Sequence, residues 1–393
     1  MPRRGCCAVP DASTLMPIFL GGALRYPALR DVVVGRRVGG AAAELQGFGV
    51  VLLADSPAVS LVPDAAGSVH GVLLGDLTAP ERSRISYYSE VTGFRLRAVL
   101  VVTPAGQVNA VAPEVREQSS APGSTLPDLT DWQARWGAIV VQTAQDVMAG
   151  FGQDAAARLA ARYPQMLVRG ASRVRGRDAA PTRLRRHAGE ADVRVDSRSL
   201  AYAGFFALED YHVSWHRFRG DMGPATGRAV FVSGDAVTVL PYDPVRDRVL
   251  VIEQFRVGAM ARGDAQPWLL EPIAGRIDPG ESPEDAARRE AVEEAGLTLG
   301  ALVPVASYYP SAGAKTEFLY SYLAIADLPD AVAGVFGLAE ESEDIRSHIL
   351  PFAELMALVS SGEANTAPLI LSALWLERER PRLRAEAGVQ PGS

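Results

Sequence analysis

The chain has 393 residues, 48% of them hydrophobic and 22% charged, a composition typical of a folded globular protein with two or three domains. With 39 Lys and Arg against 46 Asp and Glu, its formal net charge of −7 argues against a general nucleic-acid binder, because a phosphate backbone favours clustered positive charge. The two cysteines, Cys6 and Cys7, are adjacent, which argues against a disulfide framework and excludes a cysteine-rich zinc site.

The apolar segments of the chain are short. Residues 48–54, one such run, fall far below the ~18–20 residues that a helix needs to cross a bilayer. Arg3 and Arg4 are not followed by an apolar stretch of the secretory type. We therefore expect a cytoplasmic protein without a membrane partner.

Residues 15–112 are expected to form a first domain. Short apolar runs at 48–53, 72–74 and 99–102 are separated by Gly, Pro and Asp, a pattern typical of strands joined by turns. The sequence therefore predicts a small domain that contains a sheet.

Residues 113–190 are interpreted as a helical linker region. Ser, Pro and Gly are frequent in residues 113–128, as in linkers. An apolar stripe at spacings of three and four predicts a helix over 130–150, and a second helix is expected over 153–163. Seven arginines within residues 169–186 favour a solvated connector, and the alternative is a basic patch that docks on an acidic surface.

Residues 191–385 are expected to form a second domain that combines strands with helices. The pattern predicts strands over 236–241, 248–257, 268–277, 305–309 and 318–326, and helices over 282–295, 351–360 and 366–379. Mixed elements of this kind favour an α/β or α+β sandwich.

The first helix of this domain has clear ends. Ser282 is a residue type that caps free backbone N–H groups, Pro283 suits the first helical position, and Gly296 suits the position just past the end. In the loop before the helix, Glu281 is expected to pair with Arg289 and to hold the loop in place.

Three glutamates share one face of this helix. Glu290, Glu293 and Glu294 stand at i, i+3 and i+4, a spacing at which like charges repel by roughly a few tenths of a kcal/mol per pair. A hard divalent cation reverses that repulsion, because Mg²⁺ prefers oxygen ligands and often bridges carboxylates to phosphates. Taken alone, such a face is more often part of a solvated, charge-rich helix.

The wider pattern around these glutamates is more specific. Seven of its positions are restricted to one residue type, namely Gly275, Glu281, Arg289, Glu290, Glu293, Glu294 and Gly296. At ~7% per residue type, a chance match somewhere in the chain is on the order of 10⁻⁶ to 10⁻⁵. The pattern resembles the Nudix box, and Nudix hydrolases cleave diphosphates linked to a nucleoside.

The resemblance implies a divalent-metal site on this helix. The ligands implied by position are the carbonyl of Ala274 and the carboxylates of Glu290, Glu293 and Glu294. They are expected to bind two or three Mg²⁺ ions per site, with Mn²⁺ as an alternative. The resemblance also implies catalytic roles for Arg289, Glu290 and Glu294.

Segments outside the box resemble bacterial ADP-ribose pyrophosphatases over most of the second domain. These segments are residues 204–208, 240–247, 252–256, 268–275, 311–317 and 337–346. By position, Phe205 is expected to stack on adenine, Arg256 to hold the diphosphate or terminal ribose, and Arg228 to face the adenosine side. Glu341 is expected to be the catalytic base, and Glu343 to contact substrate, metal or water.

The implied reaction is Mg²⁺-dependent hydrolysis of ADP-ribose. Water attacks the adenosyl-side phosphorus, Glu341 or another site carboxylate accepts its proton, and the products are AMP and ribose 5-phosphate. In the family two chains exchange N-terminal strands, so a homodimer through the Nudix domain is expected. Two alternatives stay open: hydrolysis of another nucleoside diphosphate sugar, and a nucleotide-sensing scaffold with an inactive site.

The first domain carries a second pattern, in residues 17–30, 69–74 and 87–90. It resembles gamma-glutamylcyclotransferase-like domains, which have a small barrel, a Tyr-Gly-x-Leu loop and a glutamate that moves a proton. Here the loop reads Leu20-Gly21-Gly22-Ala23, and the glutamate position aligns with Ser89, with Glu90 one residue late. We therefore expect that activity to be lost, which leaves a docking or stability role.

The two resemblances together imply an α+β protein. Its N-terminal domain is expected to be a small β-barrel of the gamma-glutamylcyclotransferase-like type, and its C-terminal domain a Nudix α/β/α sandwich. This domain order resembles bacterial proteins grouped as tellurite-resistance Nudix proteins, a label that specifies no chemistry.

Overall fold

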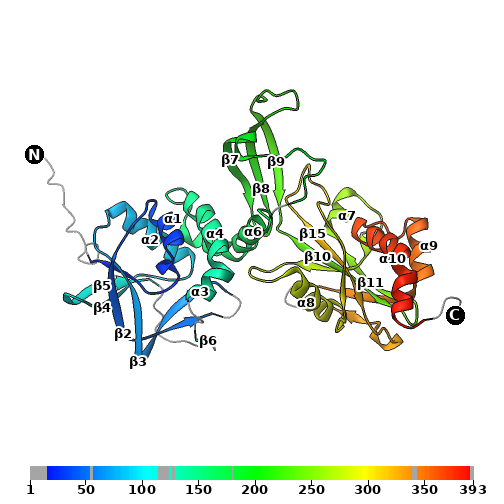
Figure 1. The fold of residues 1–393 in the computed structure, drawn as a ribbon, viewed down its shortest axis with the longest axis horizontal. Coiled ribbons are helices and arrows are strands. Elements are labelled where there is room, and N and C mark those ends of the chain that lie inside the picture. The colour runs from blue at the N-terminus through cyan, green and yellow to red at the C-terminus, as the bar shows by residue number, and fades with distance from the viewer. Residues whose placement is uncertain are drawn as a thin grey trace, which may run out of the picture. The chain divides into compact units, whose positions relative to one another are not determined.

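The computed structural model describes residues 16–53, 56–113, 124–125, 129–178, 180–338 and 343–389. They belong to two compact units, Met1–Pro181 and Thr182–Ser393, which Figure 1 colours from blue to red along the chain. Cys6, Cys7 and the expected base Glu341 lie outside the described residues. Within the described part of the chain, no helix has the length and apolar character needed to span a bilayer.

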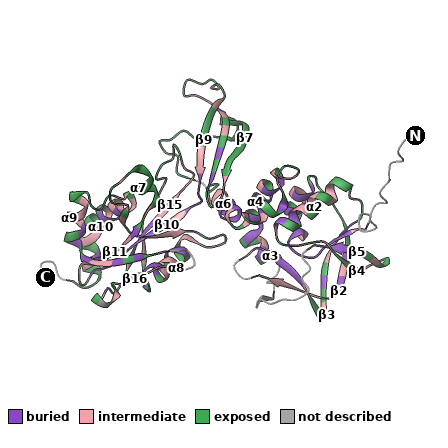
Figure 2. Cartoon of the chain, turned by 180° about the vertical axis from the view of Figure 1, so that it is seen from behind, coloured by how far each residue is buried: buried purple, intermediate pink, exposed green. Residues whose placement is uncertain are grey.

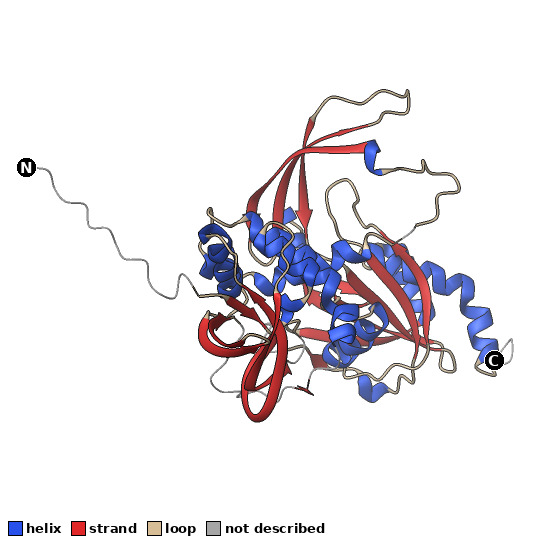
Figure 3. Ribbon diagram, turned by 60° about the vertical axis from the view of Figure 1, so that its left-hand side comes forward, coloured by secondary structure: helices blue, strands red, loops and turns tan. Residues whose placement is uncertain are grey.

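The first unit contains a closed barrel of five strands (Figure 3). The strands are β1 (Ile18–Leu20), β2 (Ala41–Leu52), β3 (Val59–Leu74), β4 (Arg97–Thr103) and β5 (Gly106–Ala112). They run in the order β3-β1-β5-β4-β2, and pairing of β2 with β3 closes the ring, while β6 (Ser124–Thr125) pairs with the end of β2. β1 and β5 are parallel, and the other pairs of the ring are antiparallel. The expected small barrel is confirmed, and its closure removes free strand edges.

Helices complete the larger core of the first unit. They are α1 (Pro27–Val34), α2 (Ala79–Val91), α3 (Leu129–Trp132), α4 (Ala138–Ala149), α5 (Ala156–Ala160) and α6 (Tyr163–Arg175), with a π-helical turn at Gln133–Gly137. Trp132 and Trp136 are each 1% exposed and pack in one cluster with Ile18 and Leu74 of the barrel. The helix predicted over 130–150 therefore exists, and it belongs to the core of the first unit.

Residues 129–175, within the segment interpreted as a helical linker region, contain helices of the first unit, whereas most of residues 113–128 lie outside the described residues. α6 covers part of the arginine-rich segment that was expected to be a solvated connector, and Arg169 on this helix is only 6% exposed. Arg173 forms an ion pair with Asp146 of α4, and Leu167 belongs to the same core as the barrel strands. This segment forms an amphipathic helix. It was not predicted, because the many arginines indicated a solvated segment although apolar residues recur along one helix face.

A small antiparallel sheet opens the second unit. It consists of β7 (Val193–Ala203), β8 (Ala207–Trp215) and β9 (Thr226–Val232), in that order. Apart from the half-buried Ala203, every residue of β7 is exposed, and Figure 2 shows this strand in the exposed colour. These three strands were not predicted from the sequence.

A mixed sheet of eight strands forms the centre of the second unit. Its strands are β10 (Ala236–Asp243), β11 (Arg248–Phe255), β12 (Trp268–Glu271), β13 (Ile273–Arg276), β14 (Leu302–Tyr308), β15 (Leu319–Ile325), β16 (Val335–Phe336) and β17 (Ile345–Pro351). The order is β14-β15-β10-β11-β17-β16, with β12 beside β11 and β13 beside β10. β10 pairs in parallel with β15 and in antiparallel with β13.

Helices cover both faces of this sheet. α8 (Pro283–Ala295) packs in one cluster with Leu250 and Ile252 of β11, whereas α9 (Phe352–Ser361) and α10 (Ala367–Glu386) pack in another with Val249 and Val251. Successive residues of β11 therefore face opposite helix layers, as expected for a strand buried on both sides. The predicted α/β/α sandwich is confirmed, and a short helix, α7 (Val257–Arg262), follows β11.

Candidate active site

α8 begins and ends where the sequence predicts. Ser282 Oγ accepts a hydrogen bond from the N–H of Asp285 at 3.1 Å, and Pro283 occupies the first turn. Gly296 ends the helix with a φ of 58°, in the left-handed region that favours glycine. The buried face of the helix includes Ala286, Ala287, Ala291 and Ala295. These small side chains let the helix lie close to the sheet.

Arg289 joins the loop before α8 to the glutamates on the helix. Its Nε and Nη2 donate to the two carboxylate oxygens of Glu281, each at 3.0 Å, which confirms the predicted pair. Its Nη1 donates to Glu290 Oε1 at 2.8 Å and to Glu293 Oε2 at 3.0 Å. Nη2 also donates to the backbone carbonyl of Arg276 at 3.0 Å. In this arrangement Arg289 positions the carboxylates of the helix.

The residue of strand β13 that lies against the Glu290 carboxylate is a glycine, Gly275. A Cβ atom on Gly275 would lie 1.7 Å from Oε1 and 1.9 Å from Cδ of Glu290, far inside van der Waals contact. No other residue type fits at this position unless the carboxylate moves. Gly280, with a φ of 81°, allows the turn in the loop that precedes the helix.

Glu294 lies deepest among the three helix glutamates. The residue is 2% exposed, and its Oε2 accepts a hydrogen bond from the backbone N–H of Ala274 at 2.9 Å. Burial raises the pKa of Glu294 to about 8, and the negative charges of Glu290 and Glu343 act in the same direction. The N–H of Ala274 opposes this rise but does not cancel it.

Glu290 shows the same behaviour to a smaller extent. Burial raises its pKa to about 7, with Arg289 opposing and Glu293 and Glu343 reinforcing the rise. Carboxylates that share a buried site are costly to ionise together unless a cation compensates them. The geometry and charge of the site therefore favour a bound cation.

Comparison with known proteins agrees with this arrangement. The NUDIX domain family matches residues 232–370. The ADP-ribose pyrophosphatase of Escherichia coli (strain K12) is 39% identical over 198 residues, which cover 50% of this chain and 94% of that protein. The chain belongs to the Nudix family. It is therefore a Nudix hydrolase, an enzyme that acts on diphosphate bonds, and α8 is its Nudix helix.

Two further relatives of this Nudix hydrolase extend the comparison. The ADP-ribose pyrophosphatase of Haemophilus influenzae (strain ATCC 51907 / DSM 11121 / KW20 / Rd) is 32% identical over 200 residues, covering 50% of this chain and 92% of that protein. The GDP-mannose pyrophosphatase of Salmonella paratyphi B (strain ATCC BAA-1250 / SPB7) is 33% identical over 150 residues, covering 38% of this chain and 77% of that protein.

Two of the sequence-predicted site residues approach the Nudix helix from other loops. Arg256, just before α7, donates from Nε to Glu271 Oε2 at 2.7 Å, and its charge lowers the pKa of Glu294. Glu343, just before β17, lies close enough to raise the pKa of Glu294. The charges of Arg256 and Glu343 thus both act on Glu294, while Glu341 lies outside the described residues.

The two residues predicted for the adenosine end lie on the small sheet. Phe205 lies in the turn between β7 and β8 and is 57% exposed. The guanidinium carbon of Arg276 lies 4.6 Å from the centroid of the Phe205 ring. Phe205 therefore contacts the Nudix box directly. Arg228, on β9, lies over the ring of Trp215 at 5.7 Å and donates to the carbonyl of Gly227 at 2.9 Å. Its contacts are thus within the small sheet.

The sequence analysis assigned no role to two residues of this region, Glu271 and Arg276. Burial raises the pKa of the Glu271 carboxyl, with Arg256 and the side chain of Gln254 opposing that rise. Arg276 links the box to the small sheet through Phe205. A charged residue within the otherwise apolar segment 268–273 was the available signal for Glu271, but nothing local indicated its partner.

The predicted metal ligands are engaged by protein groups in this structure. Arg289 bonds to Glu290 and Glu293, and Glu294 contacts the N–H of Ala274. Among the described residues, no group of three or more His, Cys, Asp or Glu side chains is arranged to hold a metal ion. The three glutamates lie on one face of α8, and Glu294 is bonded to the adjoining strand at Ala274.

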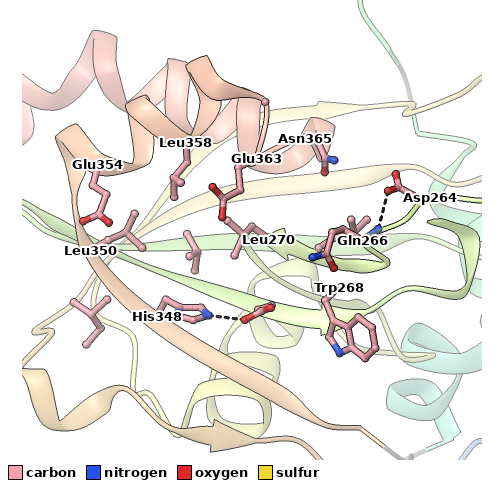
Figure 4. A pocket seen from close by; sticks show the side chains of 15 residues that line it. Asp264, Gln266, Trp268, Leu270, His348, Leu350, Glu354, Leu358, Glu363 and Asn365 are labelled. Atoms are coloured by element: carbon pink, nitrogen blue, oxygen red, sulfur yellow. Dashed lines mark hydrogen bonds and ion pairs between the residues drawn. The ribbon is translucent and has the colours of Figure 1, made fainter. Parts of the chain in front are cut away.

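A separate cavity of about 610 Å³ lies on the opposite face of the sheet, beside α9 (Figure 4). Its lining residue Val251 belongs to the core of α9 and α10 rather than to that of the Nudix helix. Acidic side chains such as Glu354 and Glu363 surround it, and His348 is hydrogen-bonded to Glu253 at 2.9 Å. None of the sequence-predicted site residues that the structure describes lines this cavity.

Proposed function

We propose that this Nudix hydrolase cleaves ADP-ribose to AMP and ribose 5-phosphate in a reaction that depends on Mg²⁺. The observation that carries the proposal is a pair of carboxylates, the half-buried Glu290 and the buried Glu294, which lies against β13 at Gly275 and Ala274. The ADP-ribose pyrophosphatases of two bacteria, 39% and 32% identical to this chain, support the choice of substrate.

The donor set fits a hard divalent cation. Carboxylate and carbonyl oxygens are the ligands that Mg²⁺ prefers, and the raised pKa values of Glu290 and Glu294 reflect buried acidic groups that a cation would stabilise in ionised form. The proposed ligands are the carboxylates of Glu290, Glu293 and Glu294 and the carbonyl of Ala274, for two or three Mg²⁺ ions per site, with Mn²⁺ as a substitute. A bound divalent ion supplies positive charge to the diphosphate and lowers the pKa of water.

The chain's own residues bind the substrate and move the proton. Arg289 keeps the helix glutamates in place, and the guanidinium of Arg256 contacts the diphosphate or the terminal ribose. Phe205 stacks on adenine. Glu341, or Glu343 two residues further along the chain, accepts the proton of the attacking water. Attack of this water at the adenosyl-side phosphorus yields AMP and ribose 5-phosphate.

A substrate panel tests this proposal. Purified full-length protein is incubated with ADP-ribose or GDP-mannose, in Mg²⁺ or in excess EDTA, and the products are separated by ion-exchange chromatography. We expect AMP and ribose 5-phosphate from ADP-ribose in Mg²⁺ only. Product formation that EDTA leaves unchanged, or no turnover of ADP-ribose, would contradict the proposal.

A second candidate substrate is another nucleoside diphosphate sugar. The GDP-mannose pyrophosphatase that is 33% identical to this chain favours it. Faster turnover of GDP-mannose than of ADP-ribose in the same panel would establish this alternative. Absence of turnover for every nucleotide sugar, together with nucleotide binding, would instead indicate the scaffold with an inactive site.

We also propose that the second unit forms a homodimer through the small sheet. The exposed apolar side chains of that sheet include Val193, Val195, Leu200, Tyr202, Leu208 and Trp215. A strand exposed along nearly its whole length invites pairing or covering by another chain. Light scattering after gel filtration should give a dimer for the wild type and a monomer for Leu200→Glu, with Leu184→Glu, at a 97% exposed loop position, as the control.

For the first unit we propose a stability or docking role without cyclotransferase activity. Glu90, the acidic residue nearest the motif position, is exposed, and the buried Ser89 hydroxyl donates to the carbonyl of Ile85 at 2.7 Å. Both residues lie on helix α2. Release of 5-oxoproline from gamma-glutamyl dipeptides by the full-length protein would contradict this proposal.

A further inference from the structure

An aromatic cluster connects the small sheet to the Nudix box. Phe205 and Phe206 meet edge to face with ring centroids 4.8 Å apart, and Phe206 lies 4.8 Å from Phe231 of β9. Phe205 is the most exposed of the three, at 57%, and the base of the proposed substrate is expected to stack on it.

The guanidinium of Arg276 lies over this cluster. It is 4.6 Å from the ring centroid of Phe205 and 6.0 Å from that of Phe206, both within the range of a cation–π contact. A planar guanidinium stacks on an aromatic face as well as attracting it electrostatically. One face of the Phe205 ring is therefore already covered by protein.

Arg276 is itself fixed to the catalytic framework. Its Nη2 donates to the carbonyl of Ser233 at 2.8 Å, and its backbone, on β13, is paired with Ala236 of β10. Its own carbonyl accepts the hydrogen bond from Arg289 at 3.0 Å. The residue follows Gly275, which contacts Glu290. Arg276 thus links the base-binding ring to the strand that borders the carboxylates.

We propose that Arg276 is a positioning residue that sets the orientation of Phe205 for stacking on the adenine base. This role rests on the proposed hydrolysis of ADP-ribose and deepens it, because it names a further determinant of base recognition. A ring that is oriented before binding loses less conformational freedom when the base arrives, so the base binds more tightly. The effect belongs to nucleotide binding, and the diphosphate chemistry at α8 is not altered by it.

The same contact allows the opposite interpretation, in which the guanidinium of Arg276 covers the face of the Phe205 ring on which the base would stack. The two readings predict effects of opposite sign. If Arg276 positions the ring, its removal weakens AMP binding. If Arg276 blocks the ring, its removal strengthens AMP binding. The hydrogen bond from Nη2 of Arg276 to the carbonyl of Ser233 holds the guanidinium against the ring in both cases, so the sign of the effect on AMP binding decides between them.

The test compares Arg276→Met and Arg276→Lys with the wild type. Methionine removes the charge and the planar group, whereas lysine keeps the charge alone. For Arg276→Met we expect AMP affinity, measured by calorimetry, to fall and the KM for ADP-ribose to rise, each by about 3- to 10-fold, with kcat within about twofold of wild type. Arg276→Lys should lie between the two, and inhibition by ribose 5-phosphate should not change.

The matched control is Arg288→Met. Arg288 also donates to backbone carbonyls, those of Leu299 at 2.8 Å and Gly300 at 3.0 Å, and it lies on α8 outside the cluster. Its substitution should leave AMP affinity unchanged. AMP affinity in Arg276→Met that equals or exceeds the wild type, or equal losses for AMP and ribose 5-phosphate, would overturn the role of Arg276 alone. A wild-type protein that neither binds AMP nor hydrolyses ADP-ribose would instead contradict the proposed function.

Discussion

Helix α8 carries the glutamates of the Nudix box, and helix α2 of the first unit carries Ser89 and Glu90, which the sequence analysis compared with a cyclotransferase glutamate. On α8, Glu290 and Glu294 are turned toward β13, and Glu294 is almost fully buried. On α2, Ser89 is buried and Glu90 is exposed. One residue on a helix corresponds to a rotation of about 100°. A shift of a single position is therefore enough to turn a carboxylate from a site into solvent.

The glycines of the two motifs show the same contrast. A Cβ on Gly275 would collide with the Glu290 carboxylate at 1.7 Å, whereas a Cβ on Gly21 would meet Phe19 Cε1 at 2.8 Å and Leu61 Cδ1 at 3.2 Å. The first glycine makes room for an acidic group, and the second makes room for core side chains. A glycine in a motif thus indicates close packing, and its neighbours decide whether that packing serves chemistry or stability.

Among the variants that compare the two units, the largest effect is expected for Gly275→Ala. The added methyl group must displace the Glu290 carboxylate, and a misplacement of about 1 Å in an active site costs about 10²-fold in rate. Steady-state hydrolysis of ADP-ribose measures this loss. Gly39→Ala, in the first unit, adds a methyl group with nothing within 4 Å and serves as the control. If Gly275→Ala hydrolyses ADP-ribose at the wild-type rate, the claim that Gly275 makes room for the Glu290 carboxylate is wrong.

A smaller loss is expected for Arg289→Met. Without Arg289, Glu281 loses its bidentate partner and the helix glutamates lose their support, so turnover should fall about 10- to 100-fold. The counterpart in the first unit is Arg36→Met, which breaks an exposed pair with Glu81 and should leave the melting temperature close to that of the wild type. Rates and thermal melting of both variants measure the difference. Equal effects on turnover would contradict the assignment of Arg289.

The two units are expected to differ in how their stability depends on pH. The pKa of Glu294 is raised to about 8 in the folded protein from an ordinary value of 4.5, so the folded state binds more protons between these values. Without metal, its contribution to stability therefore falls as the pH rises from about 5 to above 8. Glu81, whose pKa is lowered to about 2 by its hydrogen bond to Arg36, contributes the opposite slope, at acidic pH.

Glu294→Gln tests this slope in EDTA. At pH 5 the protonated glutamate and the glutamine should give similar stability, and at pH 9 the variant should be more stable by about 2 kcal/mol, because it avoids a buried charge. Thermal melting between pH 5 and 9 measures the difference. A difference that stays constant over this range would show that the Glu294 carboxyl is not perturbed.

The smallest effect is expected for Glu90→Gln. The side chain is exposed, so the free energy of unfolding should change by less than ~0.5 kcal/mol. Chemical denaturation of the full-length protein measures it. A change of several kcal/mol would show that Glu90 has a structural role and would weaken the contrast with Glu294.

The sequence predicted the features that local rules determine. Ser282, Pro283 and Gly296 fix the ends of α8, and the Glu281–Arg289 pair follows from their spacing on either side of the first turn. The spacing of Glu290 and Glu294 predicted a shared face. It did not predict how deeply Glu294 is buried, because that depth depends on the contact with Ala274 on β13.

Features that depend on distant contacts were not predicted. β7 alternates charged residues such as Arg194 and Asp196 with apolar ones but is exposed on both faces, so its pattern does not mark a core strand. The Arg256–Glu271 ion pair joins residues that meet only when β11 and β12 pair. The contact of Arg276 with Phe205 likewise requires the small sheet to meet the Nudix box.

The most direct test of the central claim is the rate at which Glu294→Gln hydrolyses ADP-ribose in Mg²⁺. Removing one buried carboxylate from the proposed metal site should lower kcat by at least ~10²-fold. Glu284→Gln, on the same helix but hydrogen-bonded to Tyr322 at 2.9 Å, should retain wild-type turnover. Turnover by Glu294→Gln equal to that of the wild type would contradict the claim that the carboxylates of α8 carry the reaction.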